Sequence, residues 1–153
     1  MRIDDRLVHG QVVEGWIPFL RANAVMIVSD EAAADETQQA LMRMALPESV
    51  ELEILPVGRA ARHAAWSPSD PRRLLVLAPG PKEVLSLLEH GARFSRVNVG
   101  GLHYTAGRVQ LGRAIFLGEQ DMDALRKISE RGVRLEGRAL PAEKELDILQ
   151  MIG

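Results

Sequence analysis

The sequence predicts an α/β protein: a single open, mostly parallel β-sheet with helices on both faces. Two observations carry this prediction. Short apolar runs alternate along the whole chain with segments of helical periodicity, and such alternation is typical of βαβ units. No linker, repeat or low-complexity segment divides the 153 residues, so we expect one domain, residues 1–153, with a full hydrophobic core.

The strands are predicted from apolar runs and from alternation. A short first strand opens the chain, and Ala24–Val28 and Leu74–Ala78 are continuously apolar, as is typical of strands buried on both faces. Residues 50–56 alternate, with Val50, Leu52 and Ile54 on one side. The remaining predicted strands are Arg96–Val99, Ala114–Leu117 and Val133–Leu140.

Helices are predicted where the apolar period becomes 3.6 residues. Glu36–Ala45 carries this pattern and ends before Pro47. Pro81–Glu89 has a proline in its first turn, and Gly91 follows its end. The other two predicted helices are Asp121–Arg131 and Asp147–Ile152.

The helix after the first strand contains a local conflict. Its apolar face consists of Val12, Val13, Trp16, Ile17 and Leu20. Pro18 interrupts that face, and proline both lacks an N–H donor and disfavours helical geometry at the preceding residue. We therefore expect a kink or an early end near Trp16, with the indole in the core.

Composition excludes several classes of function. The net charge is −2 and the arginines are spread out, so no nucleic-acid partner is expected. The absence of cysteine removes disulfides, thiolate metal sites and cysteine catalysis. No apolar run approaches the ~18 residues of a spanning helix, and the chain opens on charged residues, which does not resemble a signal peptide. We expect a cytoplasmic protein that meets a membrane only through a partner.

The absence of several sequence motifs disfavours further classes of function. The chain has no Gly-rich loop ending in Lys-Ser/Thr, no G-x-G-x-x-G after the first strand and no G-x-S-x-G nucleophile elbow. These absences disfavour nucleoside triphosphate, dinucleotide and serine-hydrolase chemistry. No cofactor and no metal are expected.

The segment from Arg2 to Val13 is the strongest chemical signal. It places a histidine, arginines and two carboxylates where the first strand gives way to a helix. A neutral nitrogen of His9 can accept a phosphoryl group, whose charge would face the N–H groups of Gly10, Gln11 and Val12 at the helix start. Arg6 can bind such a group bidentately. A lone histidine here is more often a surface residue, and Gln11 can equally lie on an exposed face, but the neighbours favour a nucleophile.

One of the two carboxylates is expected to orient the imidazole. Asp4 and Asp5 point to opposite sides if the strand persists through both. One would then bond the ring of His9 and fix its tautomer, while the other closes a turn or caps a helix. Of the two, we favour Asp5 for the functional role.

Ligands of parallel sheets bind beyond the carboxyl ends of the strands. The loops expected at that edge are Asp4–Gln11, Ser29–Asp35, Ala78–Lys82 and Asn98–Tyr104. In the last loop, Asn98, Gly100 and Gly101 predict a turn that needs positive φ or close backbone approach. It is either a plain turn or a contact for phosphate or a partner, and His103 just beyond it is a second candidate.

The other titratable residues receive simpler interpretations. His63 and His90 are expected on the surface without charged companions. A cluster of three carboxylates that could bind a metal is formed by Asp30, Glu31 and Asp35. Acids at helix starts are more often caps, so we interpret these residues as caps.

The segment Arg2–Val12 resembles the phosphorylation-site segment of the enzyme IIB subunits of the mannose/fructose/sorbose class of the bacterial sugar phosphotransferase system. Weaker resemblances support it at Val28–Ala32 with Asp35, at Asn98–His103 and at Asp121–Leu135. Family members usually have a few more residues before the Arg-Ile-Asp segment, and the match after Leu140 is weak.

The resemblance implies that His9 becomes phosphorylated and passes the phosphoryl group on. The donor would be a phosphohistidine on a separate IIA protein, and the acceptor a sugar held by the membrane subunits IIC and IID. The histidine would lie on the first strand–helix loop of an open α/β sheet, and the protein would associate peripherally with the transporter.

Two alternatives remain open at this point. One is a regulatory phosphoprotein of the same fold, and the other a non-catalytic nucleotide- or sugar-binding α/β module. For a carrier, we expect His9 to be substantially exposed on a shallow patch that joins the loops Asp4–Gln11, Ala78–Lys82 and Asn98–Tyr104.

Overall fold

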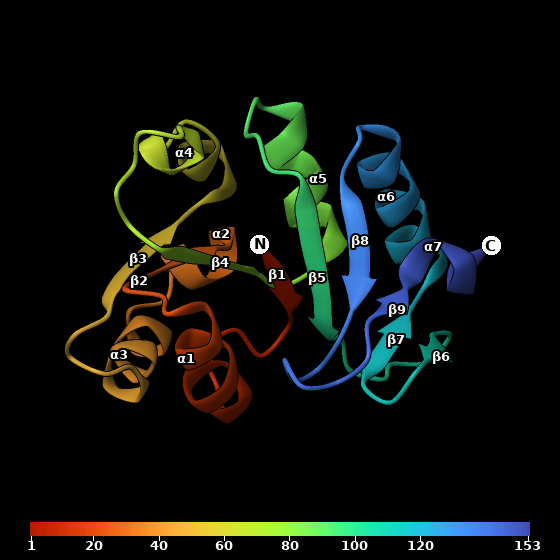
Figure 1. Cartoon of the computed structure of the whole chain (residues 1–153), viewed down its shortest axis with the longest axis horizontal. Helices are drawn as coiled ribbons and strands as arrows, with labels where there is room; N and C mark the ends of the chain where they lie inside the picture. Colours follow the sequence, from red (N-terminus) through yellow and green to blue (C-terminus); the bar gives the residue numbers. More distant parts are fainter.

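The computed structural model describes residues 1–153 and contains one seven-stranded sheet in the order β3-β2-β4-β1-β5-β8-β9 (Figure 1). All neighbouring strands are parallel except β8 and β9, which are antiparallel. The predicted open, mostly parallel sheet is therefore confirmed. Its strands are β1 Arg2–Asp4, β2 Ala24–Val28, β3 Glu51–Leu55, β4 Leu74–Ala78, β5 Arg96–Gly101, β8 Arg134–Gly137 and β9 Leu146–Asp147.

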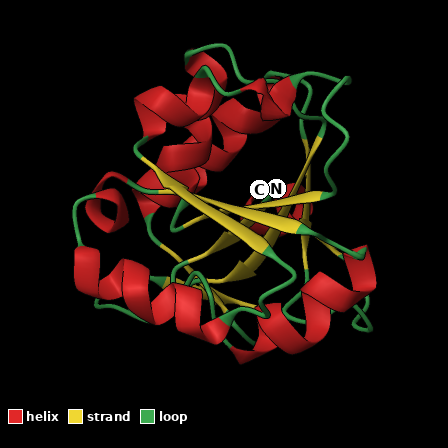
Figure 2. Ribbon diagram, turned by 90° about the vertical axis from the view of Figure 1, so that its left-hand side faces the viewer, coloured by secondary structure: helices red, strands yellow, loops and turns green.

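Helices cover both faces of this sheet (Figure 2). They are the π-helix Gln11–Trp16, α1 Ile17–Leu20, α2 Asp30–Ala33, α3 Glu36–Ala45, α4 Val57–Ala61, the 3₁₀ turn Ala64–Trp66, α5 Pro81–Glu89, α6 Glu119–Glu130 and α7 Ile148–Ile152. The predicted helices Glu36–Ala45 and Pro81–Glu89 are confirmed to the residue. The acids at residues 30–31 indicated a helix start there, and α2 begins at Asp30, whereas α4 is a short helix that the sequence pattern did not indicate.

The continuous apolar run of β2 serves two cores at once. Val25 and Ile27 pack with the π-helix, α1 and α3 on one face. Met26 and Val28 pack with α4 and α5 on the other. All four side chains are at most 1% exposed, because alternate residues of a strand point to opposite faces.

Two predicted strands need correction. Residues 115–117 form β7, Ile115–Leu117, which pairs with β6, Val109–Leu111, in a separate two-stranded hairpin. An isolated bridge between Ile115 and Leu102 links this hairpin to the chain after β5. The strand predicted over Val133–Leu140 ends at Gly137. Beyond it, the carbonyls of Arg138 and Ala139 accept hydrogen bonds from the side chain of Arg2, at 3.0 and 3.1 Å, so the backbone leaves the ladder there.

The first helix changes its winding near Trp16, as predicted. A π-turn ends with the N–H of Ile17 bonded to the carbonyl of Val12, and an α-helical turn with Pro18 in its first turn follows. The indole of Trp16 is buried, which confirms its place in the core, but Leu20 is 39% exposed and does not complete the predicted apolar face.

The carboxyl ends of β1, β2, β4 and β5 lie at one edge of the sheet, because these strands are parallel. The four loops named above follow these strands and so begin at that edge. No helix of the chain is both long enough and apolar enough to cross a membrane.

Candidate functional site

His9 lies on the tight loop that joins β1 to the π-helix. The turn is closed by a hydrogen bond from the N–H of Leu7 to the carbonyl of Asp4, at 3.0 Å. Leu7 adopts a left-handed conformation, with φ of 58°, while its side chain is buried in the core. A bulky residue in this region costs free energy, so the packing of Leu7 holds a strained loop in place.

Asp4, and not Asp5, bonds the imidazole. Asp4 Oδ2 lies 2.7 Å from His9 Nε2, and the Asp4 side chain is completely buried. The preference for Asp5 was wrong because the strand ends at Asp4 and the chain turns at once. Asp5 points instead to the loop after β5, where it accepts the N–H of His103 at 2.7 Å and contacts His103 Nδ1 at 2.5 Å.

The bond to Asp4 determines which nitrogen of His9 is free. A carboxylate accepts the Nε2–H proton, so the neutral ring presents an unprotonated Nδ1. The one side-chain hydrogen bond of His9 is at Nε2, so Nδ1 has no hydrogen-bond partner in the protein. The His9 side chain is only 14% exposed, contrary to the expected substantial exposure, because the ring lies back against the buried Asp4.

Asp4 remains ionised despite its burial. Burial alone would raise its pKa, but the hydrogen bond from His9 and the charge of Arg2 outweigh this effect, so the pKa of Asp4 lies below its ordinary value. The carboxylate also accepts the backbone N–H of Arg6 at 3.1 Å. His9 therefore faces a fixed negative charge.

The start of the helix offers unpaired donors beside this ring. The N–H groups of Gly10 and Gln11 have no acceptor within the protein, whereas those of Val12 and Val13 both bond the carbonyl of His9, at 3.0 Å. Only two of the three predicted amides are therefore free for an anion, because that of Val12 bonds the carbonyl of His9 in a 3₁₀-type turn.

The side chain of Arg6 reaches across the loop. It is 40% exposed and donates to Gln11 Oε1 at 2.9 Å. Arg6 and Gln11 line an open cavity of about 420 Å³ together with Gly101, Leu102, His103, Tyr104, Ala114 and Phe116. The structure thus brings the loop of His9 together with the loop after β5. This is expected for loops that follow the carboxyl ends of neighbouring parallel strands.

The loop after β4 contributes to a different hollow. Pro79 and Lys82 line a cavity of about 260 Å³ with Ser29, Asp30 and Glu31. That cavity does not include the loop of His9, so the structure does not bring Ala78–Lys82 into the cavity beside Arg6.

Asn98 and Gly100 lie beneath the site as parts of β5. Asn98 is buried and accepts a hydrogen bond from Arg2 Nη1 at 2.5 Å. Neither Gly100 nor Gly101 has a positive φ, so the predicted alternative of close backbone approach applies. A Cβ on Gly100 would lie 2.0 Å from Arg2 Cζ, and one on Gly101 would lie 3.3 Å from Asp4 Oδ1.

The remaining candidates lie in other settings. His63 does have a charged companion, contrary to expectation, since its Nε2 lies 2.9 Å from Glu53 Oε2. His90 is exposed and bonds the carbonyl of Ser86 within its own helix. Asp35 caps α3 by accepting the N–H of Gln38, which confirms the capping interpretation for this residue. Asp30 and Glu31 lie in the first turn of α2, which Ser29 caps.

Sequence reasoning missed Arg2, which donates to Asp4 Oδ2 at 2.9 Å. A signal was available, because Arg2 and Asp4 are two residues apart and so share one face of the first strand. Their opposite charges on a central strand predict a pair. Their position in the middle of the sheet, by contrast, depends on strand order, which the sequence does not indicate.

The fold, together with the comparisons that follow, assigns the chain to the class of α/β components of the sugar phosphotransferase system (PTS). The family described as "PTS system sorbose subfamily IIB component" matches residues 1–153, and the chain belongs to this family. The family resemblance predicted from the sequence is confirmed.

Relatives with sugar-specific names cover almost the whole chain. The PTS system fructose-specific EIIB component of Bacillus subtilis is 34% identical over 99% of this chain and 93% of its own length. The PTS system mannose-specific EIIAB component of Escherichia coli is 32% identical over 99% of this chain. The chain spans about half, 47%, of that relative.

The solved structures agree with the sequence comparison. The IIBSor domain of the sorbose permease from Klebsiella pneumoniae superimposes with a TM-score of 0.90 at 30% identity, covering 99% of this chain and 93% of that one. The N-acetylgalactosamine-specific IIB component 1 from Escherichia coli gives a TM-score of 0.88 at 30% identity, with 96% of each chain covered.

Proposed function

We propose that this chain is a phosphocarrier that receives a phosphoryl group on Nδ1 of His9 and passes it to a sugar. The donor is a phosphohistidine of a IIA protein, and the sugar is held by membrane subunits IIC and IID. The hydrogen bond between Asp4 Oδ2 and His9 Nε2 carries this proposal, since it leaves Nδ1 as the unprotonated and unpartnered nitrogen.

The transfer needs no cofactor. The lone pair of His9 Nδ1 forms a bond to phosphorus while the bond from phosphorus to the donor's imidazole nitrogen breaks. The electron pair of the broken bond stays on the donor ring. Passage to the sugar repeats the exchange, with a sugar hydroxyl oxygen as nucleophile and a proton released from it.

Two groups beside His9 suit the charge of the moving phosphoryl group. The free N–H groups of Gly10 and Gln11 point from a helix start. The guanidinium of Arg6, now bonded to Gln11 Oε1, is a planar donor set that matches phosphate oxygens. Gln11 would release Arg6 when phosphate arrives.

The surroundings of the loop suit brief contacts with partners. The cavity beside Arg6 is open, and Tyr104 and His103 at its rim are 66% and 61% exposed. IIA and the membrane subunits would use this surface in turn, which requires weak binding to each. The name of the Escherichia coli relative, EIIAB, supports a IIA partner. We further propose a cytoplasmic location at the transporter.

Incubation with a phosphorylated IIA protein tests the proposal. Acid-labile phosphate is expected on the wild type and on His103→Ala, and none on His9→Ala. Mapping of the label to His63, His90 or His103 would overturn the assignment. Transfer from the labelled protein to sugar, with membranes containing IIC and IID, then separates a transport carrier from a purely regulatory phosphoprotein.

A further inference from the structure

Arg2 is a fully buried arginine whose guanidinium binds four acceptors. Arg2 is 1% exposed. Its Nη1 donates to Asn98 Oδ1 at 2.5 Å and to the carbonyl of Arg138 at 3.0 Å. Its Nη2 donates to Asp4 Oδ2 at 2.9 Å and to the carbonyl of Ala139 at 3.1 Å. The side chain thus joins two distant segments of the chain, β5 and the residues after β8, to the carboxylate that bonds His9.

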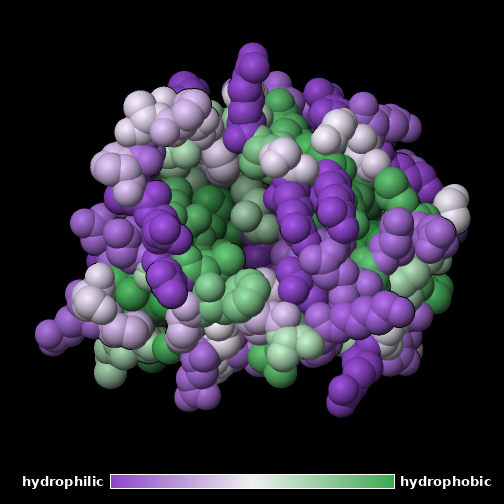
Figure 3. Space-filling model, viewed as in Figure 1, coloured by the Kyte–Doolittle hydropathy of each residue, from purple (hydrophilic) through white to green (hydrophobic).

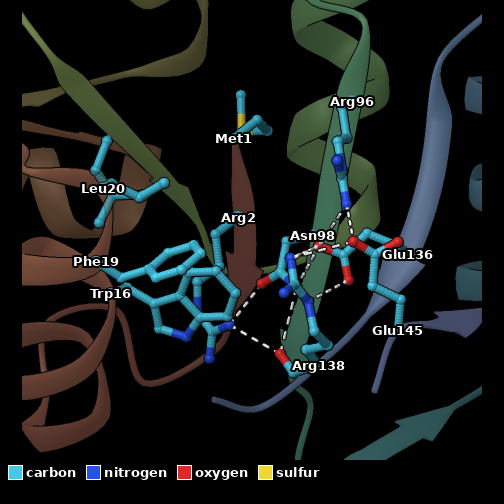
Figure 4. A pocket seen from close by; sticks show the side chains of 11 residues that line it. Met1, Arg2, Trp16, Phe19, Leu20, Arg96, Asn98, Glu136, Arg138 and Glu145 are labelled. Carbon is cyan, nitrogen blue, oxygen red and sulfur yellow. Dashed lines mark hydrogen bonds and ion pairs between the residues drawn. The ribbon is translucent and has the colours of Figure 1, made fainter. Parts of the chain in front are cut away.

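The neighbouring residues are shaped to this guanidinium. Gly100 lies directly against it, because any Cβ there would overlap Arg2 Cζ at 2.0 Å. On another side, Arg2 Cζ lies 4.9 Å from the ring centroid of Trp16 (Figure 4), a cation–π distance. Arg2 Nε nevertheless has no hydrogen-bond partner.

Such an arrangement is a poor way to gain stability. Burial of a charged pair costs about as much as the pair returns, and apolar residues of similar volume are often at least as stable. An unpartnered buried N–H adds to the cost. The fold nevertheless keeps a buried cation at this position, and the charged group that this cation contacts is Asp4.

We propose that Arg2 is a positioning residue for the phosphoryl transfer. It keeps the buried Asp4 ionised and oriented, so that Asp4 holds the proton of His9 on Nε2 and Nδ1 remains free. This inference rests on the proposed function, in which His9 carries the phosphoryl group.

The common acceptor explains how Arg2 acts through Asp4. Arg2 Nη2 and His9 Nε2 bind the same oxygen, Asp4 Oδ2, at 2.9 and 2.7 Å. Without the arginine, the completely buried carboxylate loses its cation, and its protonated form is favoured. A protonated Asp4 no longer selects the Nε2–H tautomer, so part of the His9 population presents the wrong nitrogen.

Substitution of Arg2 by methionine tests this role against a matched control. Arg96→Met removes another arginine of the same sheet face, one that pairs with Glu145 and, at 3.7 Å, with Glu136 (Figure 4). Hydrophilic side chains gather over β5 and β8 on this side of the molecule (Figure 3). Arg2→Met should slow phosphorylation of His9 by roughly 10- to 100-fold, the equivalent of one lost charge-assisted hydrogen bond. Arg96→Met should leave the rate unchanged.

The second readout is the tautomer of His9, seen in the ¹⁵N chemical shifts of its ring. Wild type and Arg96→Met should show Nε2–H alone, and Arg2→Met a mixture. This measurement needs no phosphoryl donor, so it separates failure of this inference from failure of the proposed function. Normal rate and tautomer in folded Arg2→Met would overturn the inference.

Gly100→Ala provides a test that keeps every charge. Its Cβ must displace the guanidinium, so the rate should fall and the tautomers should mix. In the Arg2→Met background the same substitution should cost little further, because the flexible methionine can yield. If Arg2→Met does not fold, Gly100→Ala decides, because its Cβ displaces the guanidinium: wild-type rate and tautomer in the folded Gly100→Ala variant would overturn the inference.

Discussion

The indole Nε1 of Trp16 donates a hydrogen bond to the carbonyl of Ala139, at 2.8 Å. This contact joins the end of the π-helix to the segment that follows β8. The same carbonyl accepts a hydrogen bond from Arg2, and a second guanidinium, that of Arg138, lies 5.2 Å from the Trp16 ring. Arg2 and Trp16, which flank the loop of His9 in the sequence, are therefore both bound to the segment after β8.

Trp16→Phe should lower the free energy of unfolding by about 1–2 kcal/mol and also slow phosphorylation. An aromatic ring remains at position 16, but the hydrogen bond of the indole and part of the cation–π attraction are lost. The loss stays moderate because Arg2 still satisfies the Ala139 carbonyl. Denaturant unfolding and the phosphorylation rate measure the two effects.

Trp66→Phe is the matched control for this prediction. Trp66 Nε1 also donates to a backbone carbonyl, that of Ala60 at 2.7 Å, but Trp66 packs on Phe94, far along the chain from His9. It should lose stability with no change in rate. Equal slowing in both variants would show that the rate follows stability alone.

Arg6→Ala should slow phosphoryl transfer about 10- to 100-fold, since an arginine that contacts the moving group through a charge-assisted bond contributes roughly 1.5–3 kcal/mol. Stability should change by less than about 0.5 kcal/mol, because the side chain is 40% exposed and its ion pair with Asp4 is long, at 3.7 Å. The exposed Arg93→Ala serves as control. A wild-type rate together with a lower melting temperature would identify Arg6 as structural.

Acid should remove the stability that Asp4 provides. The pKa of Asp4 is lowered in the folded protein, so in acid the unfolded chain binds a proton that the folded one refuses. The contribution is complete above the unfolded pKa of about 4 and is lost as the pH falls through the folded value. The stability difference between wild type and Asp4→Asn should therefore shrink from about pH 7 to about pH 3 in urea titrations. A difference that grows on acidification would contradict the lowered pKa.

Two glycines should respond oppositely to alanine. Gly10 has helical dihedral angles, and a Cβ there would meet nothing within 4 Å. Gly10→Ala should therefore keep or raise stability by up to about 1 kcal/mol. At Gly137 a Cβ would lie 2.8 Å from Ile148 Cδ1 and 3.0 Å from Ile115 Cδ1, so Gly137→Ala should destabilise by about 1–3 kcal/mol. Thermal melts compare the pair, and a stable Gly137→Ala would show that both isoleucines can move.

Features set by neighbouring residues could be predicted from the sequence. The apolar runs of β2 and β4 and the proline and glycine signals around α5 gave those elements their observed bounds. The change of winding near Trp16 followed from the geometry of Pro18 alone. These predictions need only local backbone preferences and periodicity.

The contacts around His9 required information that local patterns lack. Whether Asp4 or Asp5 faces the ring depends on the residue at which β1 ends, a difference of one position that reverses the side. Arg2 meets Asn98 and Arg138 only because β1 lies beside β5 and β8 follows it in the sheet. His63 likewise contacts Glu53 only through tertiary structure, because the end of a helix packs on a strand.

The π-helix makes the number of residues between His9 and Pro18 part of the site. Gln11–Trp16 winds with one residue more per hydrogen-bonded turn than an α-helix does. If the same residues wound as an ordinary α-helix, Trp16 would be turned by about 100° around the helix axis. The indole would then leave both Ala139 and Arg2. The wider winding of this segment therefore directs the indole to its two partners.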